Sequence, residues 1–351
     1  MGIFDGGEFL LLLFHANHIF SGVAVFQIQN LNVKQGGYEG GDTVSGELFM
    51  DVKKESKCRS IAVIFIGEVN TRWQEYNTGR YGYGYTNRAH MHWSSGYELL
   101  FKEETVFCGE GVIAPGQYTY KFSFKLPEKP IPSFAGAHGA VNYSLKGKIV
   151  RPMATDREAI SVVTVKGTHD LNKFPELSTA SRARGAIEVS GFCCRNYGSL
   201  YTQLWLPRSG YVPGEDIRVV ADVTNNSSKV VTGFSFHLIE CAKFAAFDGG
   251  YRREQNTSTV LVSSLITTDK QPRQRQRIST TLKIPETCAT QVKCAILKTN
   301  HFVELRALTS GGNVEGAVGR LPVVIGTIPF KEKPAESSSD GANLSVASVA
   351  K

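Results

Sequence analysis

A cluster of four cations within eight residues has the clearest chemistry in this chain. Its members are Lys270, Arg273, Arg275 and Arg277, which are separated by glutamines and one proline. Guanidinium groups form charge-assisted hydrogen bonds to phosphate oxygens, either on a phosphoprotein or on a lipid headgroup. The alternative is a solvated hairpin loop, in which the same side chains face water without binding a partner. The sequence leaves both interpretations open.

Catalytic motifs are missing from the sequence. It contains no GxSxG, no GxxxxGK[ST] and no HExxH, and Gly109–Gly111 is an isolated GxG that opens no βαβ unit. The pairs His15/His18 and His90/His92 have no cysteine or acid at ligand spacing, so we interpret them as loop histidines. We therefore expect a binding protein rather than an enzyme, with no cofactor and no metal.

A stretch rich in Tyr and Gly, from Gln74 to Gly96, has the run Arg80–Tyr85 at its centre. Aromatic side chains next to a cation can stack on bases. A single central arginine makes no electrostatic groove for a phosphate backbone, however. We predict a mobile surface loop here and no nucleic-acid partner.

Charge and cysteine usage describe an ordinary intracellular protein. The net charge of +7 is a mild basic excess, which favours an anionic membrane surface or a phosphorylated partner but equally fits a slightly basic surface. Seven cysteines without any CxxC spacing predict reduced thiols rather than a disulfide framework or a zinc ribbon.

The N-terminal segment contains the apolar run Phe9–Phe14, and a looser apolar stretch continues to Phe26. Polar residues interrupt it too early for a membrane-spanning helix. Asp5 and Glu8 precede the run where a signal peptide would have basic residues. We expect an added strand or a poorly ordered extension, with a signal or anchor segment as the alternative.

Short strand-like runs with Gly, Pro and Asn between them dominate the rest of the chain. Clear examples are Val44–Val52, Tyr118–Phe124 and Ile217–Val223, and no window shows a long helical period. The turn Tyr38–Val44 is echoed by Tyr211–Ile217 about half a chain later. The fold class predicted is all-β, with two tandem immunoglobulin-like antiparallel β-sandwich domains.

The domain boundaries follow from composition. We predict an apolar extension over residues 1–24, an N-terminal domain over 25–166 and a linker over 167–186. The C-terminal domain is expected over 187–330 and a disordered tail over 331–351.

Several segments, taken in order, resemble the arrestin family and specifically its α-arrestin branch. Tyr38–Gly46 is similar to the family's opening PGD-x-V-SG turn, and Ile64–Glu68 followed by Trp73 is similar to its F-x-G-x…W strand. Further similar segments are Leu126–Pro127, Pro132–Gly136, Val141–Lys146, Tyr211–Glu215 and Leu321–Pro329.

The resemblance implies a non-catalytic adaptor that binds cytoplasmic tails of membrane proteins and promotes their endocytosis, sorting or ubiquitination. It implies a cytoplasmic location with recruitment to the plasma membrane or endosomes, where sorting machinery is a further expected partner. Most α-arrestins recruit a ubiquitin ligase through PPxY motifs, but the 13 prolines here include no Pro-Pro pair, so any ligase would bind by another route. One alternative is an arrestin-fold coat or sorting subunit on endosomal membranes that acts without a ligase. A second is a secreted Ig-like adhesion protein.

The basic residues expected from the resemblance differ from those of visual and β-arrestins. Those proteins carry a buried arginine in a late strand of the N-domain and phosphate-binding lysines in the first strand. The corresponding stretches here, Ile160–Lys166 and Val25–Gln29, lack the arginine and the lysines respectively. We therefore expect no phosphorylation switch of the classical kind. Lys146, Lys148 and Arg151 form a second candidate face for an anionic partner.

Overall fold

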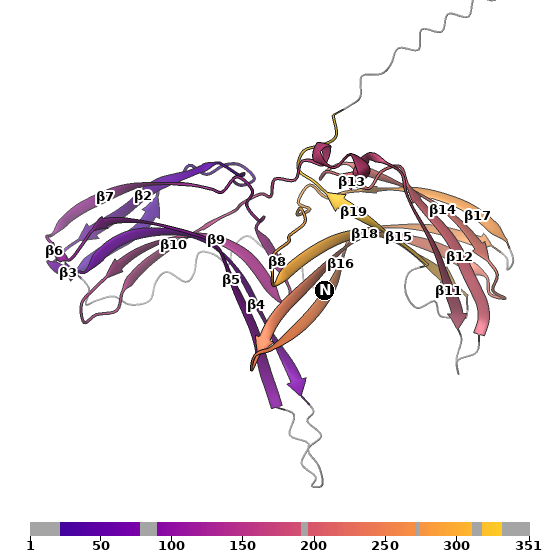
Figure 1. The fold of residues 1–351 in the computed structure, drawn as a ribbon, viewed down its shortest axis with the longest axis horizontal. Coiled ribbons are helices and arrows are strands. Elements are labelled where there is room, and N and C mark those ends of the chain that lie inside the picture. The colour runs from indigo at the N-terminus through magenta and orange to yellow at the C-terminus, as the bar shows by residue number, and fades with distance from the viewer. Residues whose placement is uncertain (1–21, 78–89, 191–195, 271–273, 311–317, 332–351) are drawn as a thin grey trace, which may run out of the picture.

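A computed structural model describes residues 22–77, 90–190, 196–270, 274–310 and 318–331. Figure 1 shows two groups of β-strands side by side, with long hairpins extending from the region between them. The residues predicted as the apolar extension and the tail lie outside the described part, except for 22–24 and 331. None of the helices in the described ranges has the length and apolar content needed to cross a membrane.

The N-terminal group consists of two packed layers. One layer is the three-stranded sheet β1-β2-β7, which contains Val23–Gln29, Thr43–Val52 and Gly116–Lys125. The other layer contains β10 (Arg157–Val163), β9 (Gly139–Val150), β4 (Ser60–Asn77) and β5 (His90–Cys108). Short strands complete the group: β3 (Ser56–Cys58), β6 (Gly111–Ile113) and β8 (Phe134–Gly136).

The C-terminal group is also layered. Its outer layer is the four-stranded sheet β11-β12-β14-β17, which contains Ser181–Ser190, Asn196–Leu206, Asp216–Asn225 and Arg275–Lys283. The facing layer contains β15 (Val231–Asp248), β16 (Tyr251–Lys270), β18 (Leu297–Thr309), β19 (Gly319–Ile325) and β13 (Gly210–Tyr211). The described strands thus confirm the all-β two-sandwich prediction.

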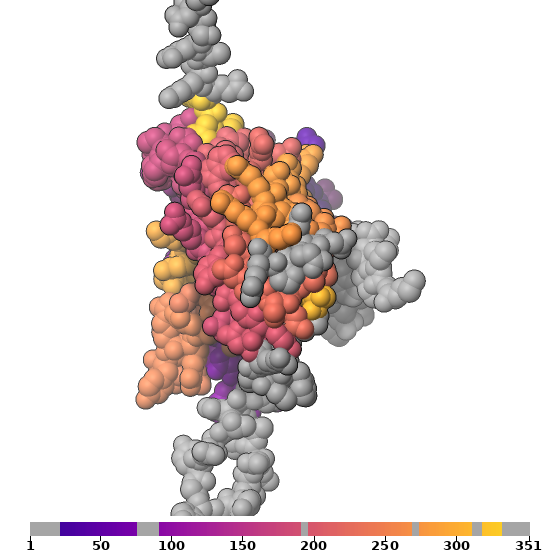
Figure 2. Space-filling model, turned by 90° about the vertical axis from the view of Figure 1, so that its right-hand side faces the viewer, coloured from indigo at the N-terminus to yellow at the C-terminus, as the bar shows by residue number. Residues whose placement is uncertain are grey.

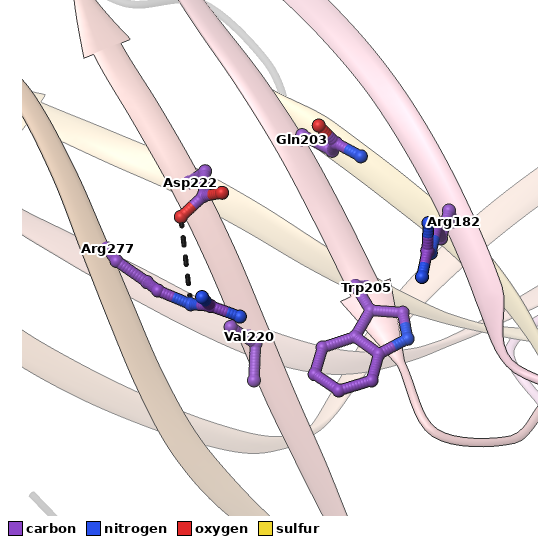
Figure 3. A pocket seen from close by; sticks show the side chains of 6 residues that line it. All are labelled: Arg182, Gln203, Trp205, Val220, Asp222 and Arg277. Carbon is purple, nitrogen blue, oxygen red and sulfur yellow. Dashed lines mark ion pairs between the residues drawn. The ribbon is translucent and has the colours of Figure 1, made fainter.

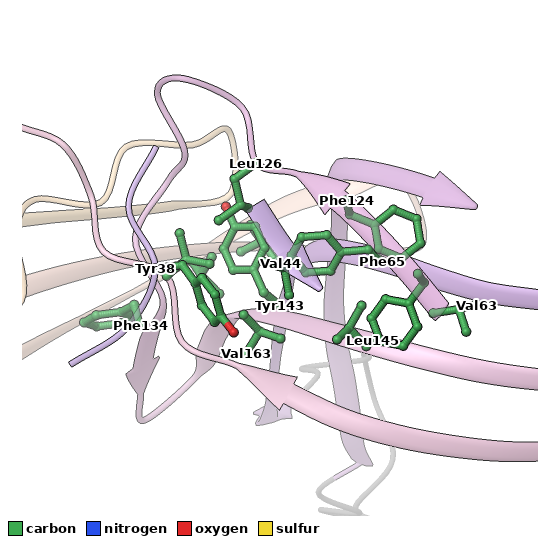
Figure 4. Packing of buried hydrophobic residues seen from close by; sticks show 14 of the residues in the cluster. Tyr38, Val44, Val63, Phe65, Phe124, Leu126, Phe134, Tyr143, Leu145 and Val163 are labelled. Atoms are coloured by element: carbon green, nitrogen blue, oxygen red, sulfur yellow. The ribbon is translucent and has the colours of Figure 1, made fainter. Parts of the chain in front are cut away.

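Alternating burial explains why these runs form sandwiches. In β2, Val44, Leu48, Met50 and Val52 point inward, while the residues between them are more exposed. Phe65 packs edge-on against Phe101 with a centroid distance of 5.2 Å, in the core shown in Figure 4.

Tyr143 is the largest of the fully buried side chains of that core. Its ring lies against Gly67, where an added Cβ would come within 2.5 Å of the ring. Its hydroxyl donates to the carbonyl of Ile131 at 2.8 Å, so the buried polar atom is satisfied. Burial raises the pKa of Tyr143 to about 12.

The two groups share one sheet, which the sequence did not predict. Ser95 of β5 pairs with Phe247 of β15, so that strands of both domains belong to a single 10-stranded sheet across the described residues. The Thr71 hydroxyl donates to the carbonyl of Ala245 at 2.7 Å. The Glu98 carboxylate accepts from the main-chain N–H of Ala295 at 2.9 Å and of Ile296 at 3.3 Å.

The surface loop predicted over Gln74–Gly96 is partly wrong. Gln74–Asn77 and His90–Gly96 belong to the paired strands β4 and β5, and residues 78–89 lie outside the described part. The ends of this hairpin are ordered by contacts with the C-terminal domain, since Gln255 donates to the Glu75 carboxylate at 3.3 Å.

The connection between the domains is fastened to the end of the last strand. The short helices η1 (Leu171–Lys173) and η2 (Pro175–Ser178) lie in it. His169 and Thr327 exchange hydrogen bonds, since the His169 N–H donates to the threonine hydroxyl and the Thr327 N–H to the His169 carbonyl, each at 2.9 Å. Strand β11 begins at Ser181, inside the range expected as linker.

Gly96 provides a test of the domain contact. We expect Gly96→Ala to lower the free energy of unfolding by about 1–3 kcal/mol, because overpacking forces backbone shifts. The new Cβ would lie 2.6 Å from the Thr71 hydroxyl and 2.9 Å from the Ala245 carbonyl. Urea denaturation measures the change. The matched control is Gly109→Ala, whose Cβ would meet nothing within 4 Å among the described residues. Equal stabilities of the two variants would contradict the tight contact.

Candidate anion-binding face of the C-terminal domain

Arg275 and Arg277 lie on β17, at one edge of the four-stranded sheet. Strand register places Arg277 opposite Asp222 of β14, Asp222 opposite Gln203 of β12, and Gln203 opposite Arg184 of β11. Directly opposed residues in antiparallel strands point to the same side of the sheet. A row of polar side chains therefore crosses the outer surface from Arg184 to Arg277.

Rows on either side extend this surface. On one side Arg182 lies opposite Trp205 and Trp205 opposite Val220, and on the other Tyr201 lies opposite Thr224 and Thr224 opposite Arg275. We call this surface the arginine face, defined by Arg182, Arg184, Tyr201, Gln203, Trp205, Val220, Asp222, Thr224, Arg275 and Arg277. Figure 2 views the molecule from the end at which this sheet lies.

Two adjoining hollows occupy the arginine face. One is lined by Arg182, Gln203, Trp205, Val220, Asp222 and Arg277, and Figure 3 shows it from close by. The other is lined by Arg184, Gly185, Tyr201, Thr202, Gln203, Asp222, Thr224 and Arg275. The indole and Val220 give the first hollow an apolar floor, and the guanidinium groups surround it. This is the arrangement of a site that binds a charged group beside a flat or aliphatic one.

The charges on the arginine face are unbalanced. Asp222 is the only carboxylate among the described residues that line either hollow, and it pairs with Arg275 at 3.2 Å and Arg277 at 3.8 Å. Both arginine side chains stay about 70% exposed (71% and 70%). Arg182 and Arg184 form no ion pair within the described residues. Four cations against one anion leave a local excess of positive charge that an anionic partner would neutralise.

The hydrogen-bonding groups point to the same kind of partner. The indole N–H of Trp205 is buried and has no acceptor among the described residues, and it lies on the Arg182 side of the ring (Figure 3). A buried donor without an acceptor costs free energy, which a bound oxygen atom would recover. The face thus presents several donors and a single carboxylate, a set that suits carboxylate or phosphate oxygens.

In the second predicted basic face, Lys148 and Arg151 already bind acceptors within the protein. Lys148 forms ion pairs with Asp156 at 2.9 Å and Glu158 at 3.8 Å, and the hydrogen bond to Asp156 raises the pKa of Lys148 and lowers that of Asp156. Arg151 donates to the carbonyl of Thr155. Lys146 lies on the same strand and forms no ion pair in the described part. These residues are proposed as a weaker anion site than the arginine face.

The remaining members of the predicted cluster are only partly described. Arg273 lies outside the described residues, and Lys270 ends strand β16 with its side chain also outside them. Sequence reasoning missed Arg182, Arg184, Gln203 and Trp205. The alternation of arginines at 182 and 184 was a usable signal, but the segment was assigned to the linker.

A cysteine, a histidine and a carboxylate also meet in the C-terminal domain. The Cys288 thiol lies 3.7 Å from Nε2 of His301, and that nitrogen lies 3.5 Å from the Glu240 carboxylate. This constellation resembles a nucleophile with its base. Burial, with a smaller effect of Glu240, raises the pKa of Cys288 to about 12. The thiol therefore stays protonated at neutral pH, which argues against a nucleophilic role.

Alkylation tests this interpretation. With its pKa about three units above the ordinary value, folded Cys288 should carry roughly a thousand-fold less thiolate than the unfolded chain at pH 8. Iodoacetamide followed by peptide mass spectrometry should therefore modify it slowly in buffer and rapidly in urea. Fast modification of the folded protein at neutral pH would restore the nucleophile hypothesis.

Among the described residues, two packed β-sandwiches share one sheet, and the second sandwich carries an open cationic face. The family model of the arrestin (or S-antigen) N-terminal domain matches residues 27–172, and that of the C-terminal domain matches residues 196–330. The chain belongs to the arrestin family, and its relatives place it with the α-arrestins, the arrestin domain-containing branch.

Three relatives from animals are similar to half or more of this chain. Arrestin domain-containing protein 17 of Caenorhabditis elegans is 28% identical over 317 residues, which cover 87% of this chain and 70% of the relative. Arrestin domain-containing protein 4 of Mus musculus is 25% identical over 325 residues, covering 89% and 74%. Thioredoxin-interacting protein of Mus musculus is 26% identical over 199 residues, covering 55% of this chain and 48% of that protein.

Charge changes on the arginine face should alter binding to a polyanion. Arg182→Glu with Arg184→Glu should lower the affinity for heparin about ten-fold or more at low salt, because counterion release weakens. Asp222→Asn should raise it, because Arg275 and Arg277 lose their carboxylate. Salt elution from a heparin column measures both effects.

The control is Lys57→Glu with Lys121→Glu, which changes the net charge equally at exposed lysines of the N-terminal domain. A similar shift for the control pair would mean that heparin senses only the overall charge, and the arginine face would then not be the binding site.

Proposed function

We propose that this protein is a non-catalytic adaptor that binds acidic or phosphorylated cytoplasmic segments of membrane proteins and promotes their endocytosis, sorting or ubiquitination. The observation that carries the proposal is the arginine face of the arrestin C-terminal domain, where Arg182, Arg184 and a buried indole N–H have no acceptor among the described residues. Family membership supports the adaptor class, since the relatives are arrestin domain-containing proteins.

A peptide is favoured over a flat membrane as the occupant of the arginine face. The hollows follow the strands for three rows of side chains, a length that suits an extended chain. Among the described residues of the face, Tyr201 is the one large apolar or aromatic side chain that is exposed (49%), so little there would enter a lipid layer. The expected location is the cytoplasm, with recruitment to the plasma membrane or endosomes by the bound cargo.

A coat or sorting subunit that acts without a ubiquitin ligase is the second candidate. Its support is the sequence, in which no two prolines are adjacent and PPxY therefore does not occur within the 351 residues.

Proximity labelling in cells tests the proposal. Labelled proteins should include plasma-membrane or endosomal proteins with acidic cytoplasmic segments, together with sorting machinery. The Arg182→Glu/Arg184→Glu variant should lose the membrane proteins, because it removes cations without breaking an ion pair seen in the described part. The Lys57→Glu/Lys121→Glu variant should keep them.

The contrary outcomes are distinct. A purely nuclear or extracellular set of labelled proteins would contradict the adaptor proposal. An unchanged set for the arginine variant would keep the adaptor class but move the cargo site elsewhere. Endoglycosidase digestion addresses the secreted alternative, because a mobility shift would contradict a cytoplasmic location.

A further inference from the structure

The hollow beside Trp205 has an aromatic and aliphatic floor with hydrogen-bond donors at one end. Trp205 of β12 lies opposite Val220 of β14, and both line the hollow on the outer side of the sheet. Arg182 lies opposite Trp205 on the edge strand β11. The indole N–H has no acceptor among the described residues, and it lies on the Arg182 side of the ring (Figure 3). The donors of Arg182 and Trp205 are therefore gathered at the same end of the floor.

Two further cations border this floor. Arg218 is two residues from Val220 along β14, so it points to the same side of the sheet about 7 Å away. It forms no ion pair within the described residues. Arg277 of β17 lines the same hollow and extends toward Val220 (Figure 3). Planar guanidinium groups stack on aromatic rings, so a ring bound on this floor would have favourable neighbours.

The carboxylates of this part of the domain lie away from the Arg182 end. Asp222 is on β14, two strands and therefore about 10 Å from β11, and it is paired with Arg275 and Arg277. The other carboxylates of β11, β14 and the preceding short helix do not line the hollow: Glu176, Glu188 and Asp216. An anionic group thus meets the least repulsion beside Arg182.

An aromatic ring with an anion at its far end matches this arrangement. The ring of a phosphotyrosine would stack on the indole, and its phosphate would accept hydrogen bonds at the Arg182 end. Phosphoserine, glutamate and aspartate carry their anion on a short aliphatic stem, so they would leave the indole uncovered. Unmodified tyrosine would cover the floor but leave the guanidinium without an anion.

We propose that this hollow binds the phosphotyrosine side chain of a peptide, with the ring on Trp205 and Val220 and the phosphate at Arg182. The inference rests on the proposed function, because it names the side chain that the arginine face recognises. It adds a preference for an aromatic ring, which the binding of acidic cargo does not require.

Fluorescence anisotropy with the full chain tests this preference. The probes are labelled peptides of one sequence that carry phosphotyrosine, phosphoserine, glutamate or tyrosine at a single position. We expect the phosphotyrosine peptide to bind about ten-fold more tightly than the phosphoserine peptide, which is the scale of one aromatic contact. Trp205→Leu should remove this difference, because leucine has no ring to stack on.

Trp93→Leu is the matched control. Trp93 lies on β5 of the N-terminal group and also has a guanidinium beside it, since that of Arg72 is 4.2 Å from the centre of its ring. This variant should keep the ten-fold difference between the two phosphopeptides. If it lost the difference as Trp205→Leu does, the hollow would not be the site.

Competition on the unmodified protein gives a test that does not depend on the folding of any variant. Phenyl phosphate should displace the phosphotyrosine peptide at about ten-fold lower concentration than inorganic phosphate does. Equal affinities of the phosphotyrosine and phosphoserine peptides would overturn the inference and leave the proposed function standing. No binding of any anionic peptide would contradict both. Displacement by adenosine monophosphate at lower concentration than by phenyl phosphate would overturn the inference in favour of a nucleotide ligand.

Discussion

The Glu98 carboxylate holds the main-chain N–H groups of Ala295 and Ile296, and the placement of the two domains depends on contacts of this kind. The Thr71 hydroxyl bound to the Ala245 carbonyl is a second such contact, in the same region of the two hairpins. Apolar burial is non-directional and tolerates sliding, whereas hydrogen bonds to main-chain groups have a defined geometry. Ile296 is buried, so its N–H would cost free energy if it were left without an acceptor, and the Glu98 carboxylate therefore favours one relative position of the domains.

The arginine face depends on the register of the strands in the four-stranded sheet. Its cations come from strands β11 and β17, which are adjacent neither in sequence nor in the sheet, and only the pairing through β12 and β14 brings them onto one surface. Like charges gathered on one sheet surface are unfavourable to folding. Asp222 relieves part of that repulsion for Arg275 and Arg277 but not for Arg182 and Arg184. A surface that keeps uncompensated cations is better explained by a partner than by stability.

The sequence predicted what depends on local alternation and failed where distant contacts decide. The run Tyr118–Phe124 alternates aromatic and polar residues, and it lies in strand β7 of the structure. Arg182 and Arg184 alternate with alanine and glycine rather than with bulky apolar residues, so their strand resembled a linker. The strand at Gln74 is ordered partly through Glu75 and its contact with Gln255, about half a chain away. No local pattern predicts such a contact, and the same holds for the meeting of Cys288 with His301.

The hydrogen bonds between His169 and Thr327 have a consequence for how the domains could move. Asn172 adds two hydrogen bonds to this set, since its side chain donates to the carbonyl of Pro329 and accepts from the N–H of Lys331. The start of the connection is thus hydrogen-bonded to the chain that follows β19. Only the residues of the connection after this point are free to span the distance between the domains. A rotation of one domain against the other must either break these hydrogen bonds or bend the chain after Phe174. The connection therefore joins the domains through hydrogen bonds as well as through the covalent chain. A cut in the connection after Phe174 would leave the two domains held together by the hydrogen bonds of His169 and Asn172.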